Sequence, residues 1–239
     1  MNSGSGVRIL RAAGRTAAVW KNGGGVTREI VVRPEGAGSD DFTWRVSLAD
    51  VAADGPFSAF PGVDRTLTLA EGAGMDLEVG GVRRLVDERF QPQDFAGDED
   101  TGCTLLSGPV VNFNVMYRRD AVRARTAVVR GRLALAVHPG ETLLVVALDG
   151  PAALERSGGP GAAEDLDPYD AALLTGPSDC VLSAAGHTAV VRFGPPVTGA
   201  GQTPGPLRSY GWPPGPDAPG GGPAEEHAGQ GRRQAARLE

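Results

Sequence analysis

The chain has 239 residues, of which 41% are hydrophobic, and its formal net charge at pH 7 is −6. This length allows one large domain or two small ones with a substantial core, and the negative charge argues against a nucleic-acid-binding surface. The sequence contains no apolar run of about 18 residues and no signal-like leader, so we expect a cytoplasmic protein without a membrane partner. Cys103 and Cys180 lie in apolar runs and are predicted to be buried free thiols.

The predicted elements are short strands, because short apolar runs alternate with turns that contain glycine or proline. This pattern predicts an all-β sandwich or barrel. In the first half of the chain, strands are expected at Val7–Arg11, Thr27–Arg33, Thr43–Ala49, Arg65–Glu71, Met75–Val79, Thr101–Ser107 and Val111–Arg118. In the second half they are expected at Thr126–Val129, Leu133–Val137, Glu141–Leu148, Ala171–Leu174, Asp179–Ser183 and Thr188–Phe193.

A weak internal repeat divides these strands into two modules. The segment Arg65–Gly72 resembles Thr142–Gly150, and Cys103–Ser107 resembles Cys180–Ser183. Similar offsets for both pairs predict two β modules in tandem. Beyond Pro195 glycine and proline become frequent, and such a composition cannot bury enough apolar surface to fold. We therefore predict a disordered tail over 196–239.

The segment Trp20–Ile30 combines a glycine-rich turn with a strand-like run. Lys21 and Asn22 precede three consecutive glycines, and Thr27 and Glu29 alternate with their neighbours farther on. Glycine lets a backbone bend sharply or approach a ligand closely, and alternation places Thr27 and Glu29 on one face. The segment fits a small-molecule site, and it fits equally an ordinary turn that leads into an edge strand.

The run Phe42–Ala49 places a basic side chain on one face of a predicted strand. Period two puts Arg45 and Ser47 opposite Trp44, which we expect in the core. An inward arginine can hold a carboxylate through two parallel hydrogen bonds. The same arginine would otherwise lie in solvent or pair with Glu29.

The loop Gly55–Arg65 contains two phenylalanines, two prolines and two glycines. Such a loop is expected to be ordered, and Phe57 and Phe60 either wall a pocket or fasten the loop to the core. Arg65 begins the next strand, where it can meet a ligand carboxylate or pair with a nearby aspartate.

The run Asn112–Arg119 places Asn112, Asn114 and Arg118 on one face of a predicted strand. Asparagine is disfavoured in strands, so two asparagines at alternate positions need a reason. Hydrogen bonds to a ligand or to the glycine-rich turn would supply one, and so would a buried structural network.

The sequence offers little catalytic machinery. Its histidines are scattered along the chain, at His138, His187 and His227. No His-x-His or Cys-x-x-Cys pair is present, so the spacing of metal ligands is missing and we expect neither a metal nor another cofactor. Glu29 is the one attractive general base, although a carboxylate beside Lys21 or Arg45 more often serves as a charge partner.

Four blocks of the sequence resemble the signature blocks of the HutD/Ves family. The blocks are Trp20–Ile30, Phe42–Ala49, Asp54–Leu69 and Asn112–Arg119. The resemblance covers about residues 7–195 and implies a cupin-type double-stranded β-helix with two jelly-roll-like halves in one chain, a bicupin. It implies a bicupin domain at 1–195, with an N-terminal half over about 7–125 and a C-terminal half over 126–195.

This family is associated with histidine utilisation, where its proposed role is regulatory. The resemblance therefore implies a metal-free, small-molecule-binding modulator of histidine utilisation. We expect its ligand to be a small anionic metabolite, a carboxylate of histidine breakdown, held in the N-terminal half. The residues assigned to this ligand are Lys21, Asn22, Gly23, Gly24, Thr27, Glu29, Arg45, Ser47, Phe57, Phe60, Arg65, Asn114 and Arg118.

Two alternatives stand beside this hypothesis. A cupin-type lyase, isomerase or hydrolase would use Glu29 and Lys21 for turnover, and Glu29→Gln would abolish that turnover without loss of binding. A non-catalytic protein-interaction module would bind no small ligand, and its polar residues would form an internal network. Cupins often pair through sheet edges, so the resemblance also allows a homodimer.

Overall fold

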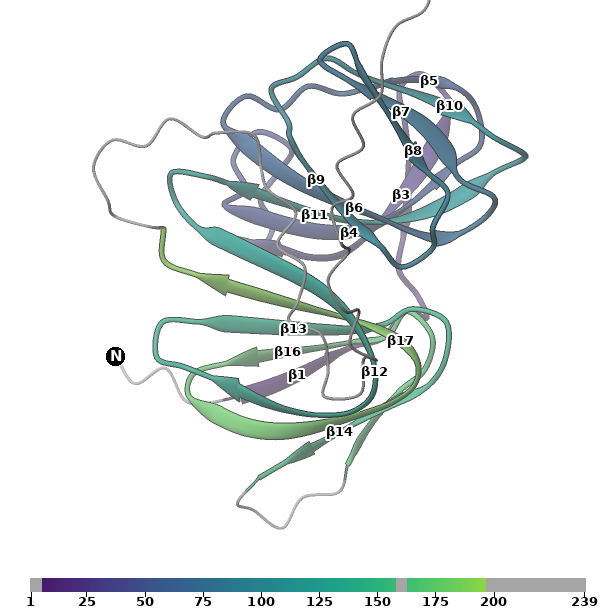
Figure 1. The fold of residues 1–239 in the computed structure, drawn as a ribbon. Helices are drawn as coiled ribbons and strands as arrows, with labels where there is room; N and C mark the ends of the chain where they lie inside the picture. Colours follow the sequence, from purple (N-terminus) through teal and green to yellow (C-terminus); the bar gives the residue numbers. More distant parts are fainter. Residues whose placement is uncertain (1–5, 158–162, 197–239) are drawn as a thin grey trace, which may run out of the picture. The chain divides into compact units, whose positions relative to one another are not determined.

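The structure, a computed structural model, describes residues 6–157 and 163–196. Within these ranges the chain forms strands and turns but no helix, which confirms the all-β prediction (Figure 1). The strands are β1 (Gly6–Leu10), β2 (Ala17–Val19), β3 (Gly25–Arg33), β4 (Trp44–Val51), β5 (Gly55–Phe57), β6 (Val63–Glu71), β7 (Met75–Val79), β8 (Val82–Val86), β9 (Pro92–Ala96), β10 (Thr101–Leu105), β11 (Val110–Arg118), β12 (Arg123–Val137), β13 (Thr142–Ala147), β14 (Ala152–Arg156), β15 (Glu164–Leu166), β16 (Ala171–Thr175) and β17 (Ser178–Gly194).

These strands form three antiparallel sheets. The N-terminal sheet has six strands in the order β2-β3-β4-β11-β6-β9, and the small sheet has four in the order β5-β10-β7-β8. The C-terminal sheet has seven strands, in the order β1-β16-β13-β17-β14-β15 with β12 paired to β17. The first strand of the chain thus joins the sheet that the last strands build, with Gly6 opposite Thr175 and Leu10 opposite Ala171.

An apolar cluster packs the N-terminal sheet against the C-terminal sheet. It combines Phe113 of β11 with Leu144 of β13, both fully buried. The Trp44 ring stacks on Phe193, with ring centroids 4.0 Å apart and planes inclined by 15°. Each such side chain contributes about 1.5–3 kcal/mol by leaving water, so this cluster holds the two sheets together. We call the face of the N-terminal sheet that carries Phe113 its outer face.

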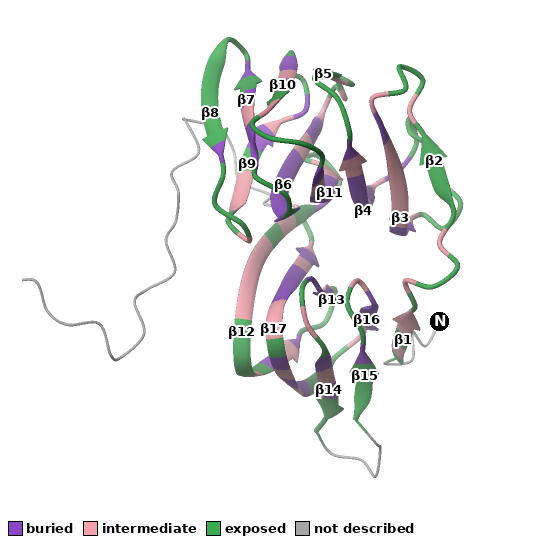
Figure 2. Ribbon diagram, turned by 90° about the vertical axis from the view of Figure 1, so that its right-hand side faces the viewer, coloured by how far each residue is buried: buried purple, intermediate pink, exposed green. Residues whose placement is uncertain are grey.

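The opposite, inner face of the N-terminal sheet packs against the small sheet. The shared cluster includes Leu67 and Leu69 of β6, Leu77 of β7 and Cys103 of β10. In Figure 2, β6 and β11 are buried over most of their length, whereas β8 at the edge of the small sheet is exposed. We call the space between these two sheets the N-terminal interior.

The C-terminal sheet encloses a core of its own, which we call the C-terminal interior. Leu143 and Val145 of β13 pack there with Leu182 and Cys180 of β17, and all four are nearly or fully buried. Both cysteines are buried free thiols, as predicted.

Two predictions about the organisation of the chain, its C-terminal tail and its division into halves, extend beyond what the described residues show. Of the predicted tail at 196–239, all but the first residue lies outside the described residues. The proposed division of the bicupin domain near residue 125 stays a prediction. The part of the chain that the structure describes has no helix with the length and apolar character that a membrane crossing requires.

Candidate functional site

Strand pairing brings polar residues from separate segments into three neighbouring rows on the inner face of the N-terminal sheet. The first row is Val32, Arg45, Met116, Arg65 and Phe95. The second row is Glu29, Ser47, Asn114, Leu67 and Gln93. The third row is Thr27, Ala49, Asn112 and Leu69. Because residues directly opposite one another share a face of a sheet, the polar members of all three rows face the N-terminal interior.

Arg65 is a buried cation surrounded by aromatic rings. Its side chain lies over Phe95, Phe57 and Phe60, with the guanidinium carbon 5.0, 5.3 and 5.9 Å from the respective ring centroids. The residue is only 8% exposed, and its Nε has no hydrogen-bond partner. Burial lowers the pKa of Arg65 to about 10, so the side chain is still charged at neutral pH.

The aromatic rings offset only part of the energetic cost of this burial. Removing an ion from water costs several kcal/mol, whereas a desolvated cation–π contact contributes about 2 kcal/mol. No carboxylate of the described residues pairs with Arg65. The guanidinium is therefore a buried cation without a counter-ion among the described side chains, and such a group can bind an anion.

Two asparagines of β11 share the inner face with this cation, Asn114 in the second row and Asn112 in the third. Asn112 is 1% exposed, and neither atom of its amide group has a partner. The Asn114 Nδ2 donates a long hydrogen bond of 3.5 Å to the carbonyl oxygen of Asn112. A buried polar group without a partner costs about 1–3 kcal/mol, so the Asn112 amide carries unused hydrogen-bonding capacity on the inner face. The predicted ligand set omits Asn112, although its alternation with Asn114 was a signal in the sequence.

Glu29 and Arg45 form an ion pair on the same face. The Glu29 Oε2 lies 3.0 Å from the Arg45 Nε, but Nε is buried and lacks the angle of a hydrogen bond. The Arg45 side chain is 21% exposed and that of Glu29 is 40% exposed. The sequence allowed Arg45 to hold a ligand carboxylate, to lie in solvent or to pair with Glu29. Among the described residues, Arg45 pairs with Glu29.

The glycine-rich turn between β2 and β3 is an ordered structural element. The Trp20 Nε1 donates to Thr27 Oγ1 at 2.8 Å, and the Trp20 ring meets Phe57 edge-on with centroids 6.1 Å apart. A Cβ on Gly25 would collide with the Asp50 carbonyl oxygen, which explains the last glycine of the three. The turn therefore carries Trp20 and Thr27 to one end of the inner face.

The other predicted residues of this turn lie on its exposed side. Lys21, Asn22 and Gly23 are exposed, and Gly24 is partly buried. The Asn22 Oδ1 accepts a hydrogen bond of 3.0 Å from the Gly24 amide, so Asn22 stabilises the turn itself. The structure does not bring these four residues into the three rows of the inner face.

The remaining predicted residues differ in what they contact. Phe57 and Phe60 both pack against the Arg65 guanidinium, as described above. The Arg118 Nε instead donates to the carbonyl oxygen of Phe42 at 2.9 Å, and a second nitrogen donates to the Asp40 carbonyl. Arg118 is thus engaged by the backbone. The role of each of these residues in ligand binding stays a prediction.

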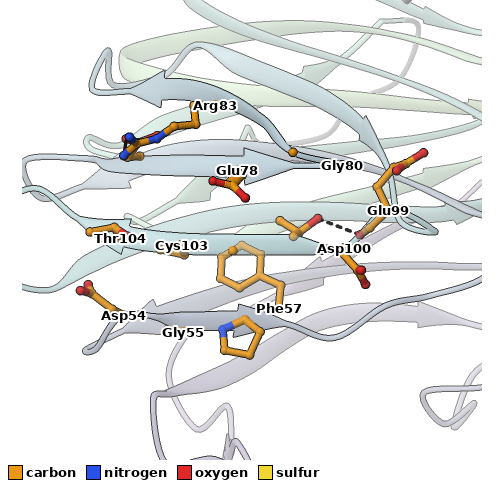
Figure 3. A pocket seen from close by; sticks show the side chains of 15 residues that line it. Asp54, Gly55, Phe57, Glu78, Gly80, Arg83, Glu99, Asp100, Cys103 and Thr104 are labelled. Atoms are coloured by element: carbon orange, nitrogen blue, oxygen red, sulfur yellow. Dashed lines mark hydrogen bonds and ion pairs between the residues drawn. The ribbon is translucent and has the colours of Figure 1, made fainter.

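A hollow of about 720 Å³ lies over the small sheet (Figure 3). Several carboxylates line it, namely Asp54, Asp76, Glu78, Glu99 and Asp100. Arg83 also lines it, but this arginine pairs with Asp76. Because these charges repel an anion, the hollow is a poorer place for a carboxylate ligand than the inner face beside Arg65. Among the described residues, no group of three or more histidine, cysteine or acidic side chains is arranged to hold a metal ion.

The arrangement of the strands is that of a cupin-type β fold. The solved structure of protein Ylba from Escherichia coli covers 79% of this chain and 90% of its own, with a TM-score of 0.60. The two sequences are only 8% identical, so this likeness concerns the fold alone. It agrees with the cupin-type architecture that the sequence blocks implied.

The particular family follows from closer matches. The HutD family model matches residues 12–191, and the chain belongs to the HutD family. The solved structure of HutD from Pseudomonas fluorescens SBW25 is 31% identical, with a TM-score of 0.69, and the match covers 80% of this chain and 99% of that one.

Curated relatives match over a shorter region. An uncharacterized 21.2 kDa protein in the hutC 3′ region of Pseudomonas putida is 40% identical over 121 residues, 51% of this chain and 63% of that protein. Protein Ves of Cronobacter sakazakii is 42% identical over 111 residues, 46% of this chain and 60% of its own length. The chain thus spans about three fifths of the curated relatives that it matches.

Proposed function

We propose that this protein binds a small carboxylate metabolite of histidine utilisation on the inner face of the N-terminal sheet and thereby modulates that pathway. Arg65 supplies the buried positive charge, Asn112 and Asn114 supply hydrogen bonds, and Phe57 and Phe60 pack around the cation. The ligand is held by arginine and amide groups and not by a metal ion.

The observation that carries this proposal is the buried, unpaired guanidinium of Arg65. A carboxylate that reached this group would replace the missing counter-ion in a site of low dielectric, where charge-assisted hydrogen bonds are strong. The unpaired Asn112 amide on the same face supports the same conclusion, because it can donate to a carboxylate oxygen.

The names of the relatives support the link to histidine utilisation. The P. putida relative is named for the hutC 3′ region, and the P. fluorescens structure is HutD in a formate condition. Formate is the smallest carboxylate. The enzyme alternative has less support, because Glu29 pairs with Arg45 and Lys21 is exposed in the turn.

A thermal-shift screen tests the proposal. The purified protein is heated with histidine, urocanate, formiminoglutamate, formylglutamate, glutamate or formate, each with and without EDTA. A ligand that binds only the folded state at about 100 times its Kd adds about 2.7 kcal/mol of stability. We expect one or more carboxylates to raise the midpoint, unaffected by EDTA.

Two variants make this screen specific. Arg65→Met removes the buried charge while keeping an apolar side chain against the phenylalanines, and it should abolish the shift. Arg132→Met removes an exposed arginine of β12 and should leave the shift intact. The proposal is wrong if no carboxylate stabilises the protein, or if Arg65→Met responds as strongly as the unmodified chain. Loss of stability on adding EDTA would instead indicate a bound metal.

A further inference from the structure

Glu29 is an acidic side chain in a place that should attract anions. It lies in the second row of the inner face, directly opposite Ser47, and its carboxylate reaches Arg45 in the first row. A carboxylate here repels any simple anion that approaches Arg45 or Arg65. Its position therefore bears on which anions the site accepts.

A β-bulge fixes the direction of this side chain. The register between β3 and β4 shifts between Glu29 and Val31, so that Ile30 is the extra residue. Ile30 and Val31 both belong to the apolar cluster on the outer face, whereas Glu29 stays opposite Ser47 on the inner face. Bulges re-aim side chains and are frequent beside active sites. The bulge anchors β3 to the core immediately after Glu29.

The ion pair leaves binding capacity on both partners. The contact at 3.0 Å involves Arg45 Nε without hydrogen-bond geometry, so the guanidinium keeps its terminal N–H groups for a carboxylate. A carboxylate has about four acceptor positions, and the Glu29 side chain is 40% exposed. Glu29 can therefore accept a hydrogen bond from a ligand while Arg45 donates to the same ligand.

We propose that Glu29 selects carboxylates that also carry an N–H donor a few bonds away, either an amide or an ammonium group. On binding, the ligand carboxylate lies between the guanidinium groups of Arg65 and Arg45, which share the first row, and the ligand N–H donates to the Glu29 carboxylate. A plain carboxylate gains the first contact but leaves Glu29 facing a second anion. This inference rests on the proposed function, because it assumes an anion on the inner face.

The test is an NMR titration of the ¹⁵N-labelled full chain with three probes: acetate, N-acetylglycine and glycine. Acetate has only the carboxylate, N-acetylglycine adds an amide N–H, and glycine adds an ammonium group. We expect the unmodified protein to bind at least one N–H-bearing probe about tenfold tighter than acetate, since hydrogen bonds to a charged group are the strong ones. Comparing the affinities for N-acetylglycine and glycine then shows whether the site prefers an amide or an ammonium donor.

Glu29→Gln removes the charge and keeps the shape of the side chain. We expect this variant to bind acetate more tightly and to reduce the preference for the N–H-bearing probe to about threefold or less. Glu155→Gln, at an exposed glutamate of β14, is the matched control and should keep the full preference. The ¹⁵N spectrum itself reports whether each variant is folded.

The outcomes separate this inference from the proposed function. If acetate binds as tightly as the other probes and Glu29→Gln changes none of the three affinities, the site binds anions but Glu29 does not select them. If Glu29→Gln raises the affinity for all three probes equally, Glu29 only competes with the ligand for Arg45. That result would overturn the inference that Glu29 recognises a ligand N–H. If no probe binds, this inference fails, and the proposed function fails with it only if the thermal-shift screen also finds no stabilising carboxylate.

Discussion

The two interiors of this protein have similar strands and opposite chemistry. On the inner face of the N-terminal sheet, Arg65 and Asn112 are buried, and neither the Arg65 Nε nor the Asn112 amide group has a hydrogen-bond partner. In the C-terminal interior, Leu143 and Leu182 are fully buried among other apolar side chains. The cation near the C-terminal interior is Arg192, which donates a hydrogen bond of 2.5 Å to Glu141 Oε2. The cation beside the C-terminal interior has a carboxylate partner, whereas Arg65 in the N-terminal interior has none among the described residues.

The internal repeat makes this contrast sharper. In the predicted internal repeat Thr66 matches Thr142, which would place Arg65 at the position of Glu141. Glu141 accepts hydrogen bonds from Arg192 and from the His138 amide, whereas Arg65 meets only aromatic rings. The two matching positions therefore carry opposite charges and have different surroundings.

The largest expected effect comes from the packed interior. Leu182→Ala should lower the free energy of unfolding by about 2–5 kcal/mol, because it leaves a cavity among fully buried neighbours. Asn112→Leu, a change in the other interior, should raise it by about 1 kcal/mol, because an unpaired amide is replaced by an apolar group of similar size. Urea denaturation measures both values. A comparable loss in the two variants would show that the inner-face amide belongs to a structural network.

A pair of arginine substitutions should give effects of opposite sign. Arg65→Met should raise the free energy of unfolding of the ligand-free protein by about 1 kcal/mol, because a buried ion without a counter-ion is removed. Arg192→Met should lower it by about 1 kcal/mol, because Glu141 loses its partner in a half-exposed pair. Denaturation curves without ligand test the signs. Equal losses for both variants would remove the distinction between the two interiors.

The smallest effect is the acid dependence of the paired charges. Burial opposes ionisation of Glu141, but hydrogen bonds from the His138 amide and from Arg192 outweigh it and lower the pKa of Glu141. A depressed folded pKa stabilises the protein above the ordinary value near 4.5, and this contribution is lost as the pH falls through the folded pKa. Glu141→Gln should therefore be less stable at pH 7 and lose less stability below about pH 4.5. A steeper acid limb in Glu141→Gln would contradict this assignment.

Much of the fold follows from patterns within single segments. Alternation and turn residues predicted strands that correspond to β3, β4, β6, β7, β11 and β13, and the all-β class with them. The pairing of β1 with β16 was beyond such reasoning, because partners 160 or more positions apart leave no mark in either segment. The bulge at Ile30 is similar, since Thr27–Arg33 reads as one regular strand in the sequence.

The candidate site was anticipated in part. Thr27, Glu29, Arg45, Ser47, Arg65 and Asn114 were singled out from the sequence, and the sheet register places all six on the inner face. The sequence could not show that Lys21 and Asn22 lie on the exposed side of the turn, because a turn's orientation depends on the sheet that it joins. Nor could it show that the backbone engages Arg118, since the Phe42 carbonyl belongs to a distant segment.

The sequence by itself determined the strand periodicity, the family blocks and the residue types from which a site can be made. These are local properties, because a period of two and a run of glycines act within a few residues. Only the tertiary structure decided that Arg65 is buried without a carboxylate partner among the described residues. That outcome depends on which side chains β4, β6 and β11 bring together across the sheet, and on the phenylalanines that exclude water from Arg65. Burial and pairing are properties of the assembled sheet, and they turn an ordinary arginine into the centre of a candidate anion site.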